Sequence, residues 1–102
     1  MKINSEIGNK KLTANSKLTI GDIYAKLKKY DTARDYLRQS LELSTEIGSK
    51  ELTKENYLKM SELFAVQKEY KKALEFFQKH ADLKDKIFNE EHSSKIAEMQ
   101  TK

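Results

Sequence analysis

The chain has 102 residues, enough for one domain, and its 37% of hydrophobic residues against 35% charged residues leaves only a thin core. Cysteine is absent, which excludes disulfides, thiolate metal sites and thiol nucleophiles. The net charge of +4 comes from 20 basic and 16 acidic residues that are mixed along every segment, which indicates a solvated surface rather than a nucleic-acid-binding stripe. No apolar run approaches the roughly 20 residues that a membrane span requires. Because proline is absent and glycine occurs three times, an all-α chain is expected.

The sequence repeats itself at a spacing of forty residues. Glu6-Ile7-Gly8 returns as Glu46-Ile47-Gly48. The further residues that return unchanged forty positions later include Lys10, Leu12, Thr13, Leu18, Ala25, Tyr30 and Ala33. A fixed period in this range is typical of stacked repeats, in which each unit buries its apolar face against its neighbour. The repeat therefore predicts a helical solenoid that serves as a binding scaffold.

The first predicted elements are a short helical remnant and a full helix. Residues 1–7 correspond to the end of a unit, and one interpretation is a piece cut from a longer protein. Gly8 follows an apolar stretch and precedes Asn9, which predicts a helix that ends at a left-handed glycine and a next helix with an Asn N-cap. Apolar residues at helical spacing then predict a helix over residues 10–28.

Three further helices are predicted, over residues 31–47, 50–68 and 71–88. Asp31 is a good N-cap for the second helix, Gly48 and Ser49 repeat the stop and the cap before the third, and Lys71 is a poor N-cap for the fourth. Alanine stands on both sides of each short turn, where the two helices of a hairpin must come close, at Ala25, Ala33, Ala65 and Ala73.

These residues resemble the tetratricopeptide repeat (TPR), a helix-turn-helix unit with a large residue, a Leu-Gly pair, a Tyr, an Ala, an aromatic and a second small residue at set spacings. The matching positions are held in the first unit by Gly21, Tyr24, Tyr30, Ala33 and Leu37, and in the second by Tyr57, Phe64, Tyr70, Ala73 and Phe77. Lys17 departs at the initial large position, and His80 replaces a small residue. The resemblance implies an all-α superhelix of antiparallel hairpins over residues 1–88, followed by a helical extension over residues 89–102. Most aromatic residues are then expected in the core, with Tyr36 and Tyr57 left partly exposed.

The resemblance also implies that a protein or peptide partner lies along the concave surface formed by the first helix of each unit. The matching groove positions are Asn15, Leu18, Asp22, Lys26, Glu55, Leu58, Lys59, Glu62 and Val66. The family's Lys and Asn clamp for a terminal carboxylate is missing, because leucines and acidic residues hold its positions. Asp22 and Glu62 are expected to repel a carboxylate, and we expect a helical or extended peptide of mixed charge, or another helix of the same protein.

The segment from Leu83 to Lys102 resembles the region after the last repeat in bacterial membrane-bound sensor proteins. There a long helix leads to a membrane span and then to a histidine kinase or a helix-turn-helix DNA-binding domain. This second resemblance implies a sensory module of a two-component sensor or transcriptional regulator, on the extracytoplasmic (periplasmic) side. The alternative is a structural assembly scaffold in a cytoplasmic multiprotein complex. The uncapped end faces, or a tail helix with Ile96 and Met99, also predict a homodimer.

No arrangement of residues predicts catalysis. His80 and His92 are twelve positions apart and fall on different faces of one helix, so no shared metal site is expected. His92 is followed by Ser93-Ser94-Lys95 and lacks the acidic residue and proline that follow a phosphoacceptor histidine. No Gly-rich phosphate loop is present, and Glu90-Glu91 has no converging nucleophile. We expect no enzyme activity, cofactor, metal or nucleic acid, and no membrane contact by these residues.

Overall fold

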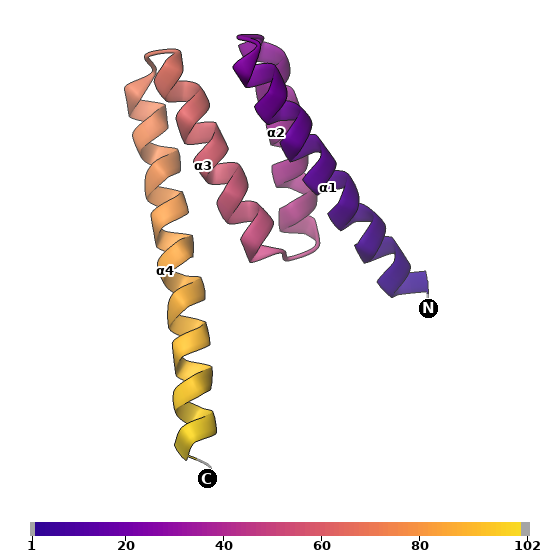
Figure 1. Cartoon of the computed structure of the whole chain (residues 1–102), viewed down its shortest axis with the longest axis vertical. Coiled ribbons are helices and arrows are strands. Elements are labelled where there is room, and N and C mark those ends of the chain that lie inside the picture. The colour runs from indigo at the N-terminus through magenta and orange to yellow at the C-terminus, as the bar shows by residue number, and fades with distance from the viewer. Residues whose placement is uncertain (1, 101–102) are drawn as a thin grey trace.

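The chain folds into consecutive helices that form two antiparallel hairpins (Figure 1). The structure is a computed structural model that describes the backbone of residues 2–100 and the side chains of residues 8–92. The helices are α1 (Lys2–Lys26), α2 (Tyr30–Glu46), α3 (Lys50–Val66) and α4 (Tyr70–Gln100). No strand occurs between residues 2 and 100, so the predicted all-α fold of helical hairpins is confirmed.

α1 is longer than the sequence predicts, because it runs through Gly8 without a break. The predicted helix end at Gly8, with a separate remnant before it, is wrong. Gly8 keeps a helical backbone and lacks the positive φ of Gly48, although both glycines have open space around them. The backbone therefore keeps the hydrogen bonds of a continuous helix, since each added residue gains one bond once the helix exists.

The same Glu-Ile-Gly sequence does end a helix where it occurs again, at Gly48. Gly48 has a φ of 70°, its N–H donates to the carbonyl of Thr45 at 3.1 Å, and the N–H of Ser49 donates to the carbonyl of Ser44 at 2.8 Å. This pair of bonds is the Schellman motif. Ser49 then caps α3, because its side chain accepts a hydrogen bond from the backbone N–H of Leu52. The predicted stop and cap are correct at this turn, where α3 folds back onto α2.

α1 and α3, the helices that precede the two hairpin turns, end with the same backbone conformation as α2, although no glycine is present there. Lys28 and Lys68 take the left-handed conformation, with φ of 64° and 66°, at the position that Gly48 holds. The predicted N-cap role of Asp31 is wrong, since α2 begins at Tyr30 and its N-cap residue is Lys29, which makes no side-chain cap bond. Asp31 lies in the first turn instead, where a carboxylate is favourable beside the positive end of the helix.

α4 has 31 residues and α2 has 17, although they occupy equivalent places in their hairpins. The stop of α2 at Ile47-Gly48-Ser49 returns as Ile87-Phe88-Asn89, so the glycine is lost and the helix continues. Figure 1 shows α4 projecting past the end of α3. The predicted division at residue 88 therefore falls inside one helix, and the side chains of Ile96 and Met99 lie outside the described residues.

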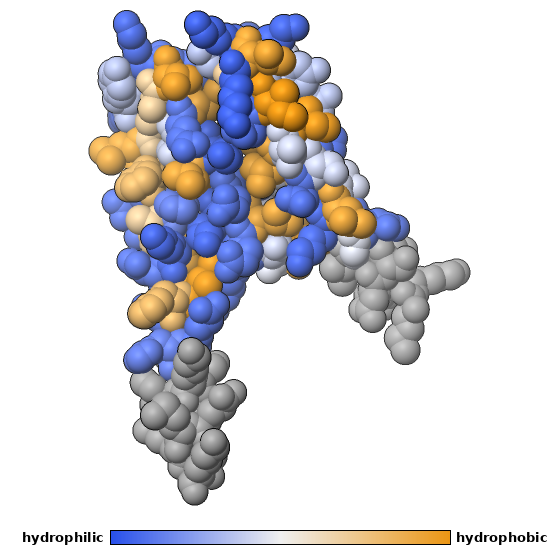
Figure 2. All heavy atoms as spheres, viewed as in Figure 1, coloured by the Kyte–Doolittle hydropathy of each residue, from blue (hydrophilic) through white to orange (hydrophobic). Residues whose placement is uncertain are grey.

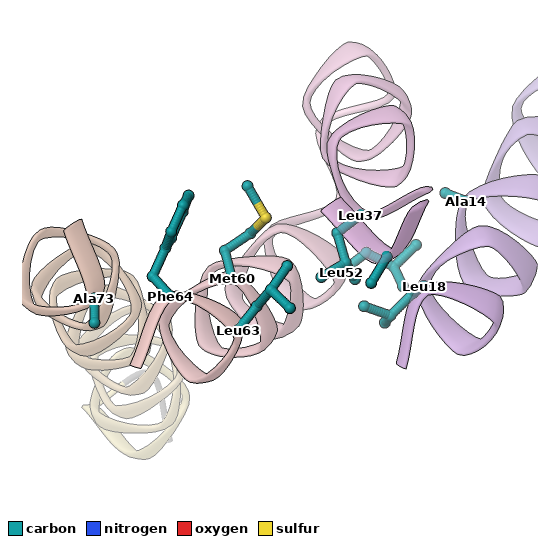
Figure 3. Close-up of a cluster of buried hydrophobic side chains, with 9 residues drawn as sticks. Ala14, Leu18, Leu37, Leu52, Met60, Leu63, Phe64 and Ala73 are labelled. Atoms are coloured by element: carbon teal, nitrogen blue, oxygen red, sulfur yellow. The ribbon is translucent and has the colours of Figure 1, made fainter. Parts of the chain in front are cut away.

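The core is a single cluster that links all four helices (Figure 3). Leu37 of α2 is 1% exposed and is buried against α1, in a cluster that also contains Leu18 of α1 and Leu52 of α3 (Figure 3). Gly21 allows this close approach, because a Cβ there would stand 2.9 Å from Cγ of Leu37. The other buried apolar residues are Ala14, Ala33, Met60, Leu63, Phe64 and Ala73.

A buried polar chain ties the first three helices together. The hydroxyl of Ser40 donates to the carbonyl of Ala14 at 2.6 Å and accepts from Nδ2 of Asn56 at 2.9 Å. Ser44 and Thr53 share a further hydrogen bond of 3.0 Å. Buried polar groups cost free energy unless they are paired, so these bonds fix how α3 sits on α1 and α2.

Each hairpin also contains a stacked aromatic pair at equivalent positions. Tyr24 and Tyr36 stack at 5.6 Å between ring centroids in the first hairpin, and Phe64 and Phe76 do so at 5.6 Å in the second. The expectation that Tyr70 and Phe77 belong to the core is wrong, because they are 65% and 51% exposed. No helix among residues 2–100 covers that side of α4 as α3 covers α2.

Candidate interaction surface

The face formed by α1 and α3 is the inner side of the curved array. α1 and α3 approach each other closely, whereas α2 and α4 make no close backbone approach among the described residues. Helices that converge on one side and diverge on the other define a concave and a convex face. The inner face is thus the one on which the sequence predicts a partner.

A hollow of about 300 Å³ lies on this inner face between α1 and α3. Its floor is apolar, and Val66 at its edge is 58% exposed. Five of the predicted groove residues line it, and the sequence analysis missed Tyr30 and Leu37, because those side chains reach the hollow from α2. Its complete lining is Asp22, Ala25, Lys26, Tyr30, Leu37, Lys59, Glu62, Leu63 and Val66.

The charged residues of this hollow neutralise one another. Asp22 lies between Lys26 at 3.3 Å and Lys59 at 3.5 Å, and Lys59 also lies 3.7 Å from Glu62. Each exposed pair of this kind is worth only about 0.2–1 kcal/mol, so the network sets local charge rather than stability. Two carboxylates balanced by two ammonium groups repel an incoming carboxylate less than the bare acids of the sequence suggest.

A second hollow of about 290 Å³ continues the same face toward the turn between α2 and α3. Asn15 of α1 and Glu55 of α3, both predicted groove residues, lie on its two walls. Leu12 in its lining is 68% exposed. The inner face therefore offers two successive apolar depressions with polar rims.

Two predicted groove leucines do not line either hollow. Leu18 is only 8% exposed and belongs to the core, so its predicted place in the groove is wrong. Leu18 instead belongs to the buried cluster that also contains Leu37 and Leu52, which Figure 3 labels. Leu58, forty residues later, is half-buried and lines neither hollow.

The outer side has a hollow of about 470 Å³ where α2 ends beside α3 and α4. The sequence analysis missed it, because it results from the divergence of α2 and α4. Three lysines lie around it, but two of them are already engaged: Lys50 bonds Glu90 at 2.7 and 2.8 Å, and Lys79 lies 5.1 Å from the ring centroid of Phe76. The hydrogen bond from Lys50 lowers the pKa of the Glu90 carboxyl below its ordinary value.

The two histidines make structural contacts. Nδ1 of His80 lies 3.1 Å from the carbonyl oxygen of Lys54, and the ring of His92 stacks on Phe88 at 6.0 Å. Among the residues with described side chains, no group of histidine and acidic residues is placed to hold a metal ion. No helix in the described part of the chain has the length and apolar character of a membrane span.

Large apolar side chains remain exposed on several surfaces. Figure 2 shows them gathered in patches between hydrophilic bands on the visible face. The exposed large apolar residues are Leu12, Ile20, Ile23, Leu27, Val66, Tyr70, Leu74, Phe77 and Phe88.

Comparison with known protein families identifies a helical-repeat family. A family model of the tetratricopeptide repeat matches residues 12–92, which contain α2, α3 and most of α1 and α4. No curated protein and no solved structure matches the chain significantly.

Proposed function

Because the chain belongs to the tetratricopeptide-repeat family, whose repeats form protein-interaction modules, we propose that it is a non-catalytic module that binds its partner along the inner face of α1 and α3. The observation that carries this proposal is the hollow between Asp22 and Val66, which combines an apolar floor with a rim of paired charges. A concave surface with a few placed polar groups is the usual form of a peptide-binding site.

The residues that line the two inner hollows indicate what kind of peptide would bind there. Each hollow accepts an apolar side chain, and the two lie in succession along the array, so a peptide with two apolar anchors fits them. The rim around Asp22 and Lys59 carries both signs of charge, which favours a mixed-charge peptide over a uniformly acidic one. An extended or a helical peptide presents anchors at such spacing.

Fluorescence polarisation with labelled synthetic peptides tests the site. The probes are an amphipathic mixed-charge peptide with leucine anchors and an acidic peptide with a free terminal carboxylate. Val66→Glu is expected to weaken binding of the first probe by more than about tenfold, since it places a charge at the apolar edge of the hollow. Leu74→Glu is the matched control, because Leu74 is similarly exposed, at 67%, but lies on α4 outside both hollows. Equal affinities for wild type and Val66→Glu would contradict the proposed site.

The acidic probe tests the charge argument separately. Replacement of both Asp22 and Glu62 by alanine is expected to improve its affinity about two- to fivefold, because the remaining lysines are then unpaired. Unchanged affinity would show that the two carboxylates do not govern the choice of partner.

We further propose a sensory setting, in which the module belongs to a bacterial signal-transduction protein and α4 transmits the bound state. What supports this is the continuity of α4 from Tyr70 to Gln100, since an unbroken helix can act as a stiff connection. The complete gene sequence tests it. A membrane span followed by a kinase or DNA-binding domain supports sensing, whereas a further run of repeats supports the second candidate, an assembly scaffold. The scaffold is favoured by one observation, the apolar surface exposed at both ends of the array.

A further inference from the structure

The chain contains one complete interface between successive hairpins, formed where α3 lies on α1 and α2. The side contributed by α3 is buried, with exposures of 8% at Leu52 and 2% at Leu63. The side contributed by α1 and α2 is also buried, with 1% at Leu37 and 0% at Ser40 and Ser44. Because the sequence repeats every forty residues, the residues of each side of this interface have equivalents forty positions away, on another part of the molecule.

The residues of α1 that are equivalent to the buried residues of α3 are exposed to solvent, as Leu12 and Ile23 show. We define this head face by the residues forty positions before Leu52, Thr53, Asn56, Met60 and Leu63, which are Leu12, Thr13, Ser16, Ile20 and Ile23. Leu12 is 68% exposed and Ile23 is 51% exposed. The head face thus keeps the apolar pattern of a buried surface without a helix to bury it among the described residues.

The residues equivalent to the side contributed by α1 and α2 lie on α3 and α4. We define this tail face by the residues forty positions after Leu18, Leu37, Ser40 and Ser44, which are Leu58, Phe77, His80 and Lys84. Phe77 is 51% exposed where Leu37 is 1% exposed. Exposed large aromatic side chains at the centre of a patch are typical of an interaction surface.

We propose that the head face of one chain docks on the tail face of a second copy, in the way that α3 docks on α1 and α2 within one chain. The occupant is a second copy because this one sequence carries both halves of an interface whose geometry it already forms internally. Leu12 belongs both to the head face and to the second inner hollow, but the other residues of the two end faces lie outside both hollows. The proposal therefore does not depend on the proposed function of the inner face.

The residues that meet in this arrangement are compatible. Ile23 falls on Phe77 as Leu63 falls beside Leu37. Ser16 falls beside His80 as Asn56 falls beside Ser40, with a hydrogen bond between them in the internal interface. A carbonyl only accepts, so His80 donates from Nδ1 to the carbonyl of Lys54, and Nε2 remains to bond the hydroxyl of Ser16, which can donate or accept.

The docking is head-to-tail, so two docked copies leave one head face and one tail face unused. Association therefore continues into longer rows as concentration rises. A symmetric dimer, in which one face meets the same face of its partner, would stop at two copies. Head-to-tail docking and a symmetric dimer can therefore be distinguished by mixing a variant with a blocked head face and a variant with a blocked tail face.

The test is sedimentation velocity on wild type, Ile23→Glu, Phe77→Glu and the control Leu74→Glu, with circular dichroism to confirm that each is folded. Wild type and Leu74→Glu are expected to form concentration-dependent oligomers. Ile23→Glu, which blocks the head, and Phe77→Glu, which blocks the tail, are each expected to weaken association more than about tenfold. An equal mixture of these two blocked variants is expected to form a heterodimer, because the intact tail of one meets the intact head of the other.

Several results would overturn the proposal: a monomeric wild type at millimolar concentration, a mixture of blocked variants that stays monomeric, loss of association in Leu74→Glu, or a loss confined to one of the two blocked variants. A second variant guards against a tail mutation that acts through folding. The triple substitution Phe77→Leu, His80→Ser and Lys84→Ser gives the tail face the residues of α2. It is expected to tighten association by more than about tenfold, and unchanged or weaker association would contradict the forty-residue correspondence.

Discussion

The first hairpin, α1 and α2, has α3 packed on its open side, whereas the second hairpin, α3 and α4, has no helix packed on the equivalent side among the described residues. Equivalent residues therefore have different environments, as at Leu37 with 1% exposure and Phe77 with 51%. The repeat pattern specifies which side chains can be buried. The neighbouring unit decides whether they are, because a solenoid has no closed core.

The largest effect is expected when the central core residue is truncated. Leu37→Ala leaves a cavity among α1, α2 and α3 and is expected to lower the free energy of unfolding by about 2–5 kcal/mol. Phe77→Ala is expected to cost less than about 1.5 kcal/mol, because half of that side chain is already in water. Urea denaturation followed by circular dichroism measures both. Equal decreases in the free energy of unfolding would mean that Leu37 and Phe77 are equally buried, and would contradict the difference between the two hairpins.

Much of this comparison was predictable from the sequence. The spacing of forty residues gave the order of the hairpins, and Gly48 with Ser49 gave the turn between them. Of the alanines beside the hairpin turns, Ala33 and Ala73 are buried as predicted, whereas Ala65 is exposed, so its predicted place in a close helix contact is wrong. The exposure of Phe77 and Tyr70 was not predictable in this way, because the pattern of a repeat is the same whether or not a neighbour covers it. The same limit applies to Leu18, which is buried in the cluster formed with neighbouring helices that local spacing does not place.

The two glycines of the repeated Glu-Ile-Gly segment are expected to respond with opposite signs. Gly48→Ala forces a side chain into the left-handed region at φ 70° and is expected to cost about 1–2 kcal/mol. Gly8→Ala lies inside a helix with free space around it and is expected to gain up to about 1 kcal/mol. Thermal melts of the two variants measure both changes. Destabilisation by both substitutions would indicate that α1 is broken at Gly8, as the sequence alone predicts.

The hairpin turns offer a smaller test of the same backbone rule. Lys28→Gly removes the left-handed strain of about 1–2 kcal/mol and loses about 0.5–1 kcal/mol through the greater freedom of the unfolded chain, so a net gain of about 0.5 kcal/mol is expected. Lys68→Gly is expected to behave alike. Lys29→Gly is the control, since Lys29 has a φ of −94° and no strain to release. A stabilised control, or destabilised Lys28→Gly, would contradict the assignment of these turn ends.

The smallest effect is expected at the ion pair between Lys50 and Glu90, which joins α3 to α4. Its hydrogen bond lowers the pKa of Glu90 below the ordinary value of 4.5, so the folded state favours the charged carboxylate. The contribution is therefore present above pH 4.5 and is lost as the pH falls through the lower folded pKa. Carbon-detected NMR titration of the Glu90 carboxyl checks this, and Lys50→Ala is expected to return its midpoint toward 4.5. An unmoved midpoint would mean that Lys50 does not hold this carboxyl.

The most direct test of the central claim, that α3 seals the first hairpin while the second stays open, is amide hydrogen exchange in the monomeric Ile23→Glu variant. Amides of α2 around Leu37 are expected to exchange only through global unfolding, and amides of α4 around Phe77 through local opening at a lower free energy. Equal protection of α2 and α4, or stronger protection of α4, would contradict the account.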